Sequence, residues 1–376
     1  MVPSSPASRR HWFKTTAAGL AGLALSRQFL VAPAHAQPAV APGRKIDIAR
    51  LSGNENSLGP SPRALAAMRD NLDRAHYYPF AEQAELAQKI AALEGVPVDH
   101  IVMGVGSGEI LEIWGIYLGR EKGDVVTASP GYLQMPAAME RMGSKVVAVP
   151  LNDQLEHDLE AMAAKVGANT KCVYICNPNN PSGTIVHAAK LRAFCLEVSK
   201  KCPVFIDEAY LQCADDFAAN TMVGLVRDGH NVAVARTFSK LYGLAGMRVG
   251  YGVMQPEMAR AIRNFSTGSL NMLGILAATA SLDDPTYATE MRLRIKAARG
   301  ALVDVIKRLG RRYAEPQGNF VFFHTGMPIQ TFQARMRAEN VAVARPFPPL
   351  LDWARISIAT PEEMTMCHAA LRKVLG

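Results

Sequence analysis

The chain has 376 residues, of which 49% are apolar and 20% charged, an ordinary composition for a globular protein that can bury a full core. Its formal net charge is +8, but residues 1–36 hold four basic residues and no acid, so removing four of the eight leaves +4. A residual charge this small, with no basic stripe, argues against a nucleic-acid partner.

The first 36 residues have the three parts of an export signal. The basic segment "SRRHWFK" is followed by the apolar "TTAAGLAGLAL" and by "APAHAQ", whose small residues predict cleavage after Ala36. The paired arginines resemble a twin-arginine signal, with an ordinary secretion signal or a short anchor as alternatives. Because the apolar segment is short for a bilayer span, we expect an exported, periplasmic protein without stable membrane insertion.

After a leader that begins at residue 37, the chain alternates helical patterns with short apolar runs, which is typical of an α/β protein. Helical patterns lie at 136–143, 189–201 and, longer and basic, at 288–310. The first seven predicted strands are rich in β-branched residues, as in a sheet covered on both faces. They lie at 100–105, 124–129, 145–150, 172–177, 203–208, 232–237 and 248–254, and three later strands are predicted at 319–325, 341–346 and 353–359.

Six cysteines could form disulfides in an exported protein, but none has the paired spacing of a metal or redox site. Cys172 and Cys176 lie four residues apart in a predicted strand, which separates their Cα atoms by about 13 Å and excludes a direct bridge. We expect most of them to be buried thiols and predict no metal site. Whether any pair forms stays open.

Two loop motifs follow predicted strands, at the edge where open α/β sheets bind their ligands. In "GVGSGEILEI" (104–113) a glycine turn leads into a helix, so the amides of Ser107, Gly108 and Glu109 can face an anion. Such turns are also common helix caps. In "NPNNPSG" (177–183) Asn180 can project an amide into a site, although a simple turn explains the prolines equally well.

The motif "FIDEAY" (205–210) places an acid at the end of an apolar strand. If Asp207 is buried there it needs a cationic partner, because an isolated buried charge is costly. Tyr210 lies three residues further on and could reach the same ligand. The alternative is that Asp207 caps the next helix.

The motif "RTFSKLYGLAGMRVG" (236–250) holds one lysine among hydroxyl residues. Lys240 follows Thr237 and Ser239, and Arg248 lies eight residues beyond it. This pattern can hold an anion beside an amine, which would suit a phosphate-bearing aldehyde. A solvated loop lysine is the alternative interpretation.

Together these motifs resemble the aspartate aminotransferase superfamily of fold type I pyridoxal phosphate enzymes, and within it the histidinol-phosphate aminotransferase family. Asp207 lies 27 residues after Asn180 and 33 residues before Lys240, and both separations agree with this family. Further matches are "NENSLGPSP" (54–62), "YP" (78–79), "SPGY" (129–132), "NF" (319–320), "VAVARP" (341–346) and "ARISIATPEE" (354–363).

The fold implied by the resemblance is α/β, the PLP-dependent transferase fold type I. It has a large domain with a mostly parallel seven-stranded sheet and a smaller α+β domain. Residues 37–75 would form an N-terminal arm and part of the small domain, 76–275 the large cofactor-binding domain, and 276–376 the rest of the small domain. Residues 1–36 would be the twin-arginine signal peptide.

The resemblance also implies a role for each motif residue. Lys240 would form a Schiff base with the aldehyde of pyridoxal 5'-phosphate and move a proton at the substrate Cα, and Asp207 would pair with the pyridinium nitrogen. Asn180 and Tyr210 would hydrogen-bond the ring hydroxyl, and Tyr132 would stack on the ring. The phosphate would be held by the amides of Ser107, Gly108 and Glu109, by Thr237, Ser239 and Arg248, and by Tyr78 of the neighbouring subunit, which implies a homodimer.

For substrates, the resemblance implies a ping-pong transfer of an amino group between an L-amino acid, or a histidinol phosphate-like amine, and a 2-oxo acid. Arg355 would bind the α-carboxylate, with Asn54 as a weaker contact, and Arg345 matches an arginine that binds a substrate phosphate. The chain departs from the family at Ser57 and Leu58, where a proline and a phosphate-binding tyrosine are usual, and at Gly108, where an aspartate is usual.

Two other functions stay open from the sequence. The same scaffold supports decarboxylation and side-chain elimination or cleavage, since the protein selects which bond of the substrate breaks. A periplasmic binding protein for an amino acid or small metabolite is the non-enzymatic alternative, and it would need neither Lys240 nor Asp207.

Overall fold

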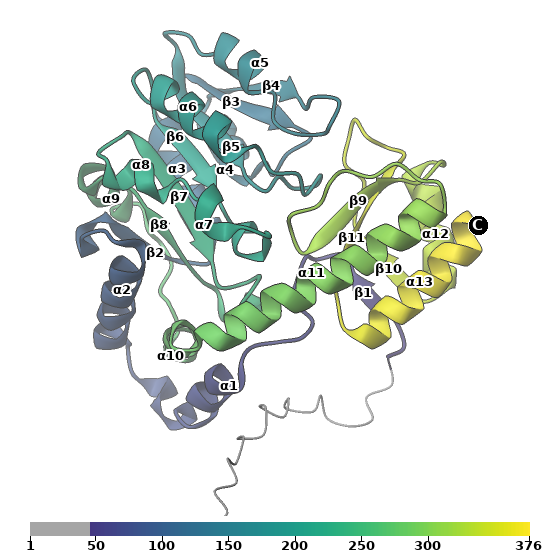
Figure 1. Cartoon of the computed structure of the whole chain (residues 1–376). Helices are drawn as coiled ribbons and strands as arrows, with labels where there is room; N and C mark the ends of the chain where they lie inside the picture. The colour runs from purple at the N-terminus through teal and green to yellow at the C-terminus, as the bar shows by residue number, and fades with distance from the viewer. Residues whose placement is uncertain (1–45) are drawn as a thin grey trace, which may run out of the picture. The chain divides into compact units, whose positions relative to one another are not determined.

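The computed structural model describes residues 46–376, so the predicted signal peptide lies outside the described residues. These described residues belong to one compact unit (Figure 1). In the described part of that unit, no helix has both the length and the apolar character to cross a membrane. The division into a large and a small domain stays a prediction.

A seven-stranded sheet forms the centre of the fold, with the strands in the spatial order β2-β8-β7-β6-β5-β3-β4. Strand β8 is antiparallel to both of its neighbours, and the other strands run parallel. This confirms the predicted mostly parallel sheet. The strands are β2 (Ile101–Val105), β3 (Asp124–Ser129), β4 (Lys145–Pro150), β5 (Thr170–Cys176), β6 (Val204–Asp207), β7 (Val232–Thr237) and β8 (Val249–Val253).

The sheet is buried on both faces because successive side chains of a strand point to opposite sides. In β5, Val173 and Ile175 join one hydrophobic cluster, while Tyr174 and Cys176 join another. The first cluster is completed by α1 (Pro62–Arg69), α2 (Phe80–Glu94), α6 (Ala188–Val198), α8 (Val223–Arg227) and α10 (Met272–Leu282). The second is completed by α3 (Ser107–Gly119), α4 (Gln134–Arg141) and α9 (Pro256–Arg263).

Both ends of the described chain contribute to a second group of elements around α11 (Pro285–Arg308) (Figure 1). Strand β1 (Ala49–Leu51) pairs with β10 (Val341–Val343), and β9 (Phe320–His324) pairs with β11 (Trp353–Ser357). The strands pack with α12 (Ile329–Ala338) and α13 (Pro361–Leu375) in one hydrophobic cluster. The sequence analysis missed β1, because three residues are too few to show a period.

The shorter elements connect these layers. They are α5 (Leu159–Ala164), α7 (Phe217–Asn220) and the 3₁₀ turns η1 (Leu72–His76), η2 (Val98–His100), η3 (Leu211–Cys213) and η4 (Ala245–Met247). All six cysteines are buried as free thiols. The expectation of buried thiols is therefore confirmed.

Candidate active site

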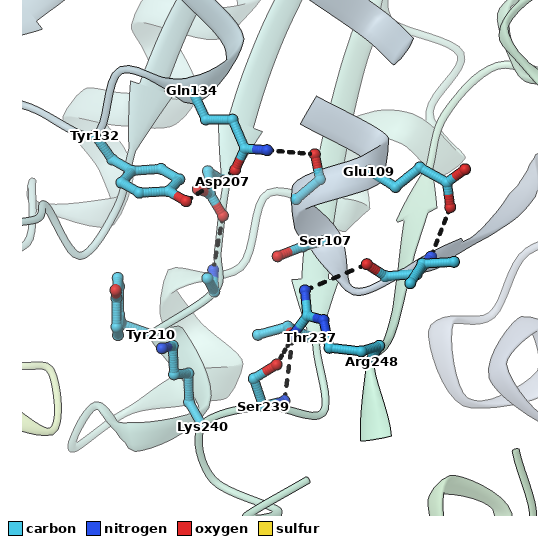
Figure 2. Close-up of a pocket in the computed structure, with 13 residues that line it drawn as sticks. Ser107, Glu109, Tyr132, Gln134, Asp207, Tyr210, Thr237, Ser239, Lys240 and Arg248 are labelled. Atoms are coloured by element: carbon cyan, nitrogen blue, oxygen red, sulfur yellow. Dashed lines mark hydrogen bonds between the residues drawn. The ribbon is translucent and has the colours of Figure 1, made fainter. Parts of the chain in front are cut away.

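A cavity of about 320 Å³ opens where the parallel strands β6 and β7 end, within the size range of about 300–1,000 Å³ for small-ligand sites. Figure 2 shows the side chains around it. The predicted residues in its wall are Ser107, Gly108, Glu109, Tyr132, Asp207, Tyr210, Thr237, Ser239, Lys240 and Arg248, joined by Val105, Gln134 and Ala209.

One end of the cavity carries a buried carboxyl group. Asp207 is the last residue of β6 and is only 1% exposed. Its oxygens accept hydrogen bonds from the backbone N–H of Ala209 at 3.1 Å and from the hydroxyl of Tyr174 at 3.0 Å. Burial raises the pKa of Asp207 to about 6, although both hydrogen bonds act in the opposite direction. A cation bound here would therefore be strongly favoured.

The opposite end is suited to an anion. Helix α3 begins at Ser107, and the first N–H groups of a helix lack partners within it. Gly250 of β8 lets this helix start approach the sheet, since a Cβ at that position would collide with the Ser107 nitrogen. The hydroxyl of Thr237 donates to that of Ser239 at 2.9 Å, and both line the cavity. The start of α3 and the two hydroxyls thus line the same cavity and can contact one anion.

Arg248 adds a cation to the anion end. Its backbone is left-handed, with φ 55°, which is uncommon for a residue other than glycine, and its side chain points toward the start of α3 (Figure 2). The guanidinium donates to the carbonyls of Ala245 at 2.9 Å and Val105 at 3.3 Å. Arg248 therefore lies beside the amides that the sequence assigned to a phosphate.

The side chain of Glu109 points away from the cavity (Figure 2). It accepts hydrogen bonds from the N–H groups of Val105 and Gly268 at 2.6 and 2.8 Å, and from the hydroxyl of Ser266 at 3.0 Å. Burial raises the pKa of Glu109, but the hydrogen bonds outweigh it, so the pKa of this carboxyl group is lowered. The prediction for Glu109 concerned its amide, and the structure shows that the carboxylate instead fastens the 266–268 loop to the helix.

Lys240 lies in the same cavity, with its Nζ 5.3 Å from the centroid of the Tyr210 ring. Burial, and then the positive charge of Arg355, lower the pKa of Lys240 to about 8. A lysine with this pKa is largely neutral at mildly alkaline pH, so it can act as a nucleophile or base.

A polar network connects the cavity to β11. The Tyr210 hydroxyl accepts from the side-chain amides of Asn54 at 3.3 Å and Asn180 at 3.2 Å. The Asn180 oxygen in turn accepts from Arg355, which also donates to the Ser52 carbonyl at 2.8 Å. The network therefore brings together four residues that the sequence predicted separately, of which Tyr210 lines the cavity and Asn54, Asn180 and Arg355 do not.

Arg355 is the buried cation of this network. It is 7% exposed, its Nε has no hydrogen-bond partner among residues 46–376, and burial lowers its pKa to about 10. Its guanidinium lies over the rings of Phe347 and Phe320, at 4.9 and 5.4 Å. A buried guanidinium without a carboxylate partner is costly, which makes an anionic ligand favourable here.

Two predicted residues are exposed outside the cavity. Tyr78 is 81% exposed and stacks on Phe80, with ring centroids 5.8 Å apart. Arg345 lies over Phe347 at 4.6 Å and donates to the carbonyl of Pro346. Neither is among the residues that line the cavity of the single chain.

Tyr174, Gln134 and Asn319 have roles around the site that no motif predicted. Gln134 donates to the Gly108 carbonyl and accepts from the Tyr132 hydroxyl. The Asn319 side chain donates to the backbone carbonyls of Asn54 and Glu55. For Asn319, the matching "NF" segment was a usable signal.

Comparison with known sequences shows to which family the chain belongs. The family described as "Aminotransferase class I and II" matches residues 46–372. The chain belongs to the class I and II aminotransferases. Within this family, the histidinol-phosphate aminotransferase of Symbiobacterium thermophilum is 37% identical over 336 residues, covering 88% of this chain and 91% of the relative. The enzyme of that name from Akkermansia muciniphila is 34% identical, covering 88% and 90%.

A solved class I and II aminotransferase structure agrees with the fold. The histidinol-phosphate aminotransferase of Sinorhizobium meliloti, in complex with pyridoxal-5'-phosphate, is 32% identical to this chain. The two match with a TM-score of 0.80, covering 87% of this chain and 91% of the other. The protein is accordingly a pyridoxal phosphate-dependent aminotransferase.

The residues of this aminotransferase fit that cofactor. A buried carboxyl group with a raised pKa suits the cationic ring nitrogen, and the α3 amides with Arg248 suit the phosphate. Lys240 places an amine of lowered pKa in the same cavity. A binding protein would need neither Lys240 nor Asp207, so the site favours the enzyme over that alternative.

Proposed function

We propose that this aminotransferase transfers the amino group of an L-amino acid to a 2-oxo acid, as an exported homodimer. The observation that carries the substrate class is Arg355, whose buried guanidinium keeps one N–H without a partner in the described part of the chain. A bidentate carboxylate would satisfy it. Asn180 contacts both Arg355 and Tyr210, so the carboxylate would lie close to the reacting centre.

The residues of the site would each have a separate role in catalysis. When bound, the cofactor supplies an electron sink for the carbanion formed at the substrate Cα. Lys240 would hold the cofactor aldehyde and then move the proton at Cα. Asp207 would keep the ring nitrogen protonated, while Asn180 and Tyr210 would orient the ring hydroxyl. Arg248, Ser239 and Thr237 would anchor the phosphate with the α3 amides.

The departures from the histidinol-phosphate family support an amino acid over a phosphorylated amine as the donor. Leu58, which stands where the family usually has a phosphate-binding tyrosine, packs against a cluster that includes Leu241, Met291 and Ile295. It thus brings no hydroxyl to a substrate. Arg345 could still hold a second anionic group, because it is exposed and its charge acts on Arg355.

The first experiment adds single amines to the purified mature protein without any 2-oxo acid. Glutamate, aromatic amino acids and histidinol phosphate are each tested, with the visible absorption of the bound cofactor and the released products as readouts. If one amine removes the visible absorption band of the bound cofactor and the matching 2-oxo acid is released, amino transfer is established and the donor begins to be identified. Release of carbon dioxide and an amine would establish decarboxylation instead, and Lys240→Ala should abolish either reaction.

Exposed aromatic residues support the homodimer. Tyr77, Tyr78 and Phe80, at the end of η1 and the start of α2, are 61%, 81% and 77% exposed. Side chains of this size that cluster on a surface usually mark an interface. A second copy of the chain that covers these residues would bring the phosphate site of that second copy close to Tyr78. Sedimentation analysis of the mature protein should give a dimer, and a monomer at micromolar concentration would contradict this part of the proposal.

The composition of residues 1–36 supports export by the twin-arginine route, and the family match begins only at residue 46. That route carries folded proteins, which suits an enzyme that loads its cofactor in the cytoplasm. Fusing residues 1–36 to a reporter tests this: export should be lost when Arg9 and Arg10 are both changed to lysine, or in cells that lack the pathway. Continued export in both cases would favour an ordinary secretion signal.

A further inference from the structure

We propose that Gln134 is a positioning residue that fixes the Tyr132 ring to the start of helix α3, and that Gly108 is the substitution that makes room for it. The inference rests on the proposed cofactor site and adds a residue to it. Both side chains and Gly108 line the same cavity (Figure 2).

The carboxamide of Gln134 joins the two halves of the site. Its Nε2 donates to the Gly108 carbonyl at 3.0 Å, and its Oε1 accepts from the Tyr132 hydroxyl at 2.8 Å. The Gly108 carbonyl can only accept, so it sets which way the carboxamide faces. Burial raises the pKa of Tyr132 to about 12, so this hydroxyl remains a donor. One side chain therefore fixes the ring-stacking residue to the phosphate-binding helix.

Gly108 and this conformation of Gln134 depend on each other. A Cβ at residue 108 would lie 3.1 Å from Oε1 and 3.3 Å from Nε2 of Gln134, so the carboxamide would have to shift by a few tenths of an ångström. Gly108 is the second residue of α3, and its φ is not positive. The backbone therefore does not require glycine here, and the room it leaves for Gln134 provides a reason for it.

The consequence is a Tyr132 ring with a set orientation before the cofactor binds. Without Gln134 the hydroxyl would lose its acceptor and the ring would be free to rotate, so binding would have to order it. Losing one neutral hydrogen bond of this kind corresponds to roughly a 3- to 10-fold change in an equilibrium constant. The effect should therefore appear as weaker binding of pyridoxal phosphate and as altered asymmetry around it.

The test is a double-mutant cycle on the dimeric apoprotein, with Gln134→Met, Tyr132→Phe and both together. The readouts are the Kd for pyridoxal phosphate and the visible circular dichroism of the bound cofactor. We expect Gln134→Met to raise the Kd roughly 3- to 10-fold and to change the dichroic band. In the Tyr132→Phe background it should add little, because the hydrogen bond is already gone. The inference would be overturned if the two substitutions raised the Kd independently of each other, or if Gln134→Met left the Kd and the dichroic spectrum unchanged.

Gly108→Ala is a second test that leaves Gln134 in place. It should weaken cofactor binding by displacing the carboxamide, and in a Gln134→Ala background the same change should cost nothing further. Gln255→Ala is the matched control for a merely structural glutamine, since the Gln255 amide donates to Val226 and His230. It should lower the melting temperature without changing the Kd. A wild-type protein that binds no pyridoxal phosphate would contradict the proposed function itself, whereas wild-type binding with a Gly108→Ala variant of unchanged Kd contradicts only this inference.

Discussion

The hydroxyl of Tyr174 donates a 3.0 Å hydrogen bond to Oδ2 of Asp207 from the neighbouring strand of the central sheet. Both residues are 1% exposed, so water does not compete for this bond. It lowers the pKa of Asp207 against the larger effect of burial, which raises it. Tyr174 therefore helps to keep Asp207, the proposed partner of the cofactor nitrogen, ionised.

Replacing Tyr174 with phenylalanine should impair catalysis without abolishing it. Hydrogen bonds to charged groups contribute about 1.5–3 kcal/mol, so we expect kcat to fall about 10-fold or more with a smaller change in KM. Because Asp207 would be harder to ionise, the acid limb of the pH–rate profile should move to higher pH. Steady-state kinetics between pH 5 and 9 measure both effects.

Tyr251→Phe is the matched control for Tyr174→Phe. Tyr251 is also buried and donates to a carboxylate, that of Glu94 at 2.6 Å, but it packs in the cluster on the other face of the sheet. The control variant should lose stability and keep the wild-type pH profile. If both variants shift the acid limb equally, Tyr174 acts only through stability.

Much of the site could be predicted because Asp207 and Thr237 end parallel strands, and such ends meet at one edge of a sheet. Tyr174 could not be predicted in this way, since inside an apolar strand it is indistinguishable from a core aromatic residue. Its role depends on the pairing of β5 with β6, which sets Cys176 opposite Asp207 and Tyr174 two residues away on the same face. Gln134 was missed because its contact with Gly108 of α3 joins segments that lie apart in the sequence.

Asp207→Asn should make the apoprotein more stable while it disables the enzyme. The pKa of Asp207 is raised from 3.8 to about 6 in the folded chain, so the folded state holds this proton more tightly than the unfolded state. Stability from this group is therefore present below about pH 4 and lost as pH rises through 6, a cost of about 2–3 kcal/mol. Asparagine never ionises and avoids that cost.

Thermal unfolding of the two apoproteins between pH 4 and 8 checks this. The melting temperature of Asp207→Asn should exceed that of wild type by an increasing margin up to about pH 6 and a constant margin above it. With cofactor and substrate, kcat should fall about 100-fold. A variant that is less stable than wild type at pH 8 would show that burial of this carboxylate is not costly.

Capture of added pyridoxal phosphate by the apoprotein should follow the titration of Lys240. Its pKa is lowered from 10.5 to about 8 by burial and by Arg355, and only the neutral amine attacks an aldehyde. Stopped-flow absorbance should show a capture rate that rises with pH and levels off above about pH 8. Arg355→Leu removes the positive charge, so the midpoint should move upward.

The control for Arg355→Leu is Arg312→Leu, which removes a cation that lies over the Trp353 ring instead. It should leave the midpoint at the wild-type value. A wild-type rate that is still rising steeply at pH 10 would mean that Lys240 titrates as an ordinary exposed lysine.

Two impaired variants should complement each other if Tyr78 completes the site of the partner subunit. We expect Tyr78→Ala to lower activity about 10-fold or more by removing a phosphate contact, and Lys240→Ala to abolish it. In a mixed dimer, the subunit that keeps Lys240 would receive an intact Tyr78 from its partner. Subunits mixed at random in equal amounts should then recover about a quarter of the wild-type sites, because half of the dimers are mixed and each has one complete site.

The matched control mixes Lys240→Ala with Asp207→Asn. Both of these residues line the cavity of a single chain, so neither subunit of a mixed dimer can supply what the other lacks, and activity should stay at the level of the separate variants. Tyr78, by contrast, is 81% exposed and lies outside the cavity of its own chain. Recovery in the first mixture alone would establish a shared site, and recovery in neither would assign the exposed aromatic residues to some other contact.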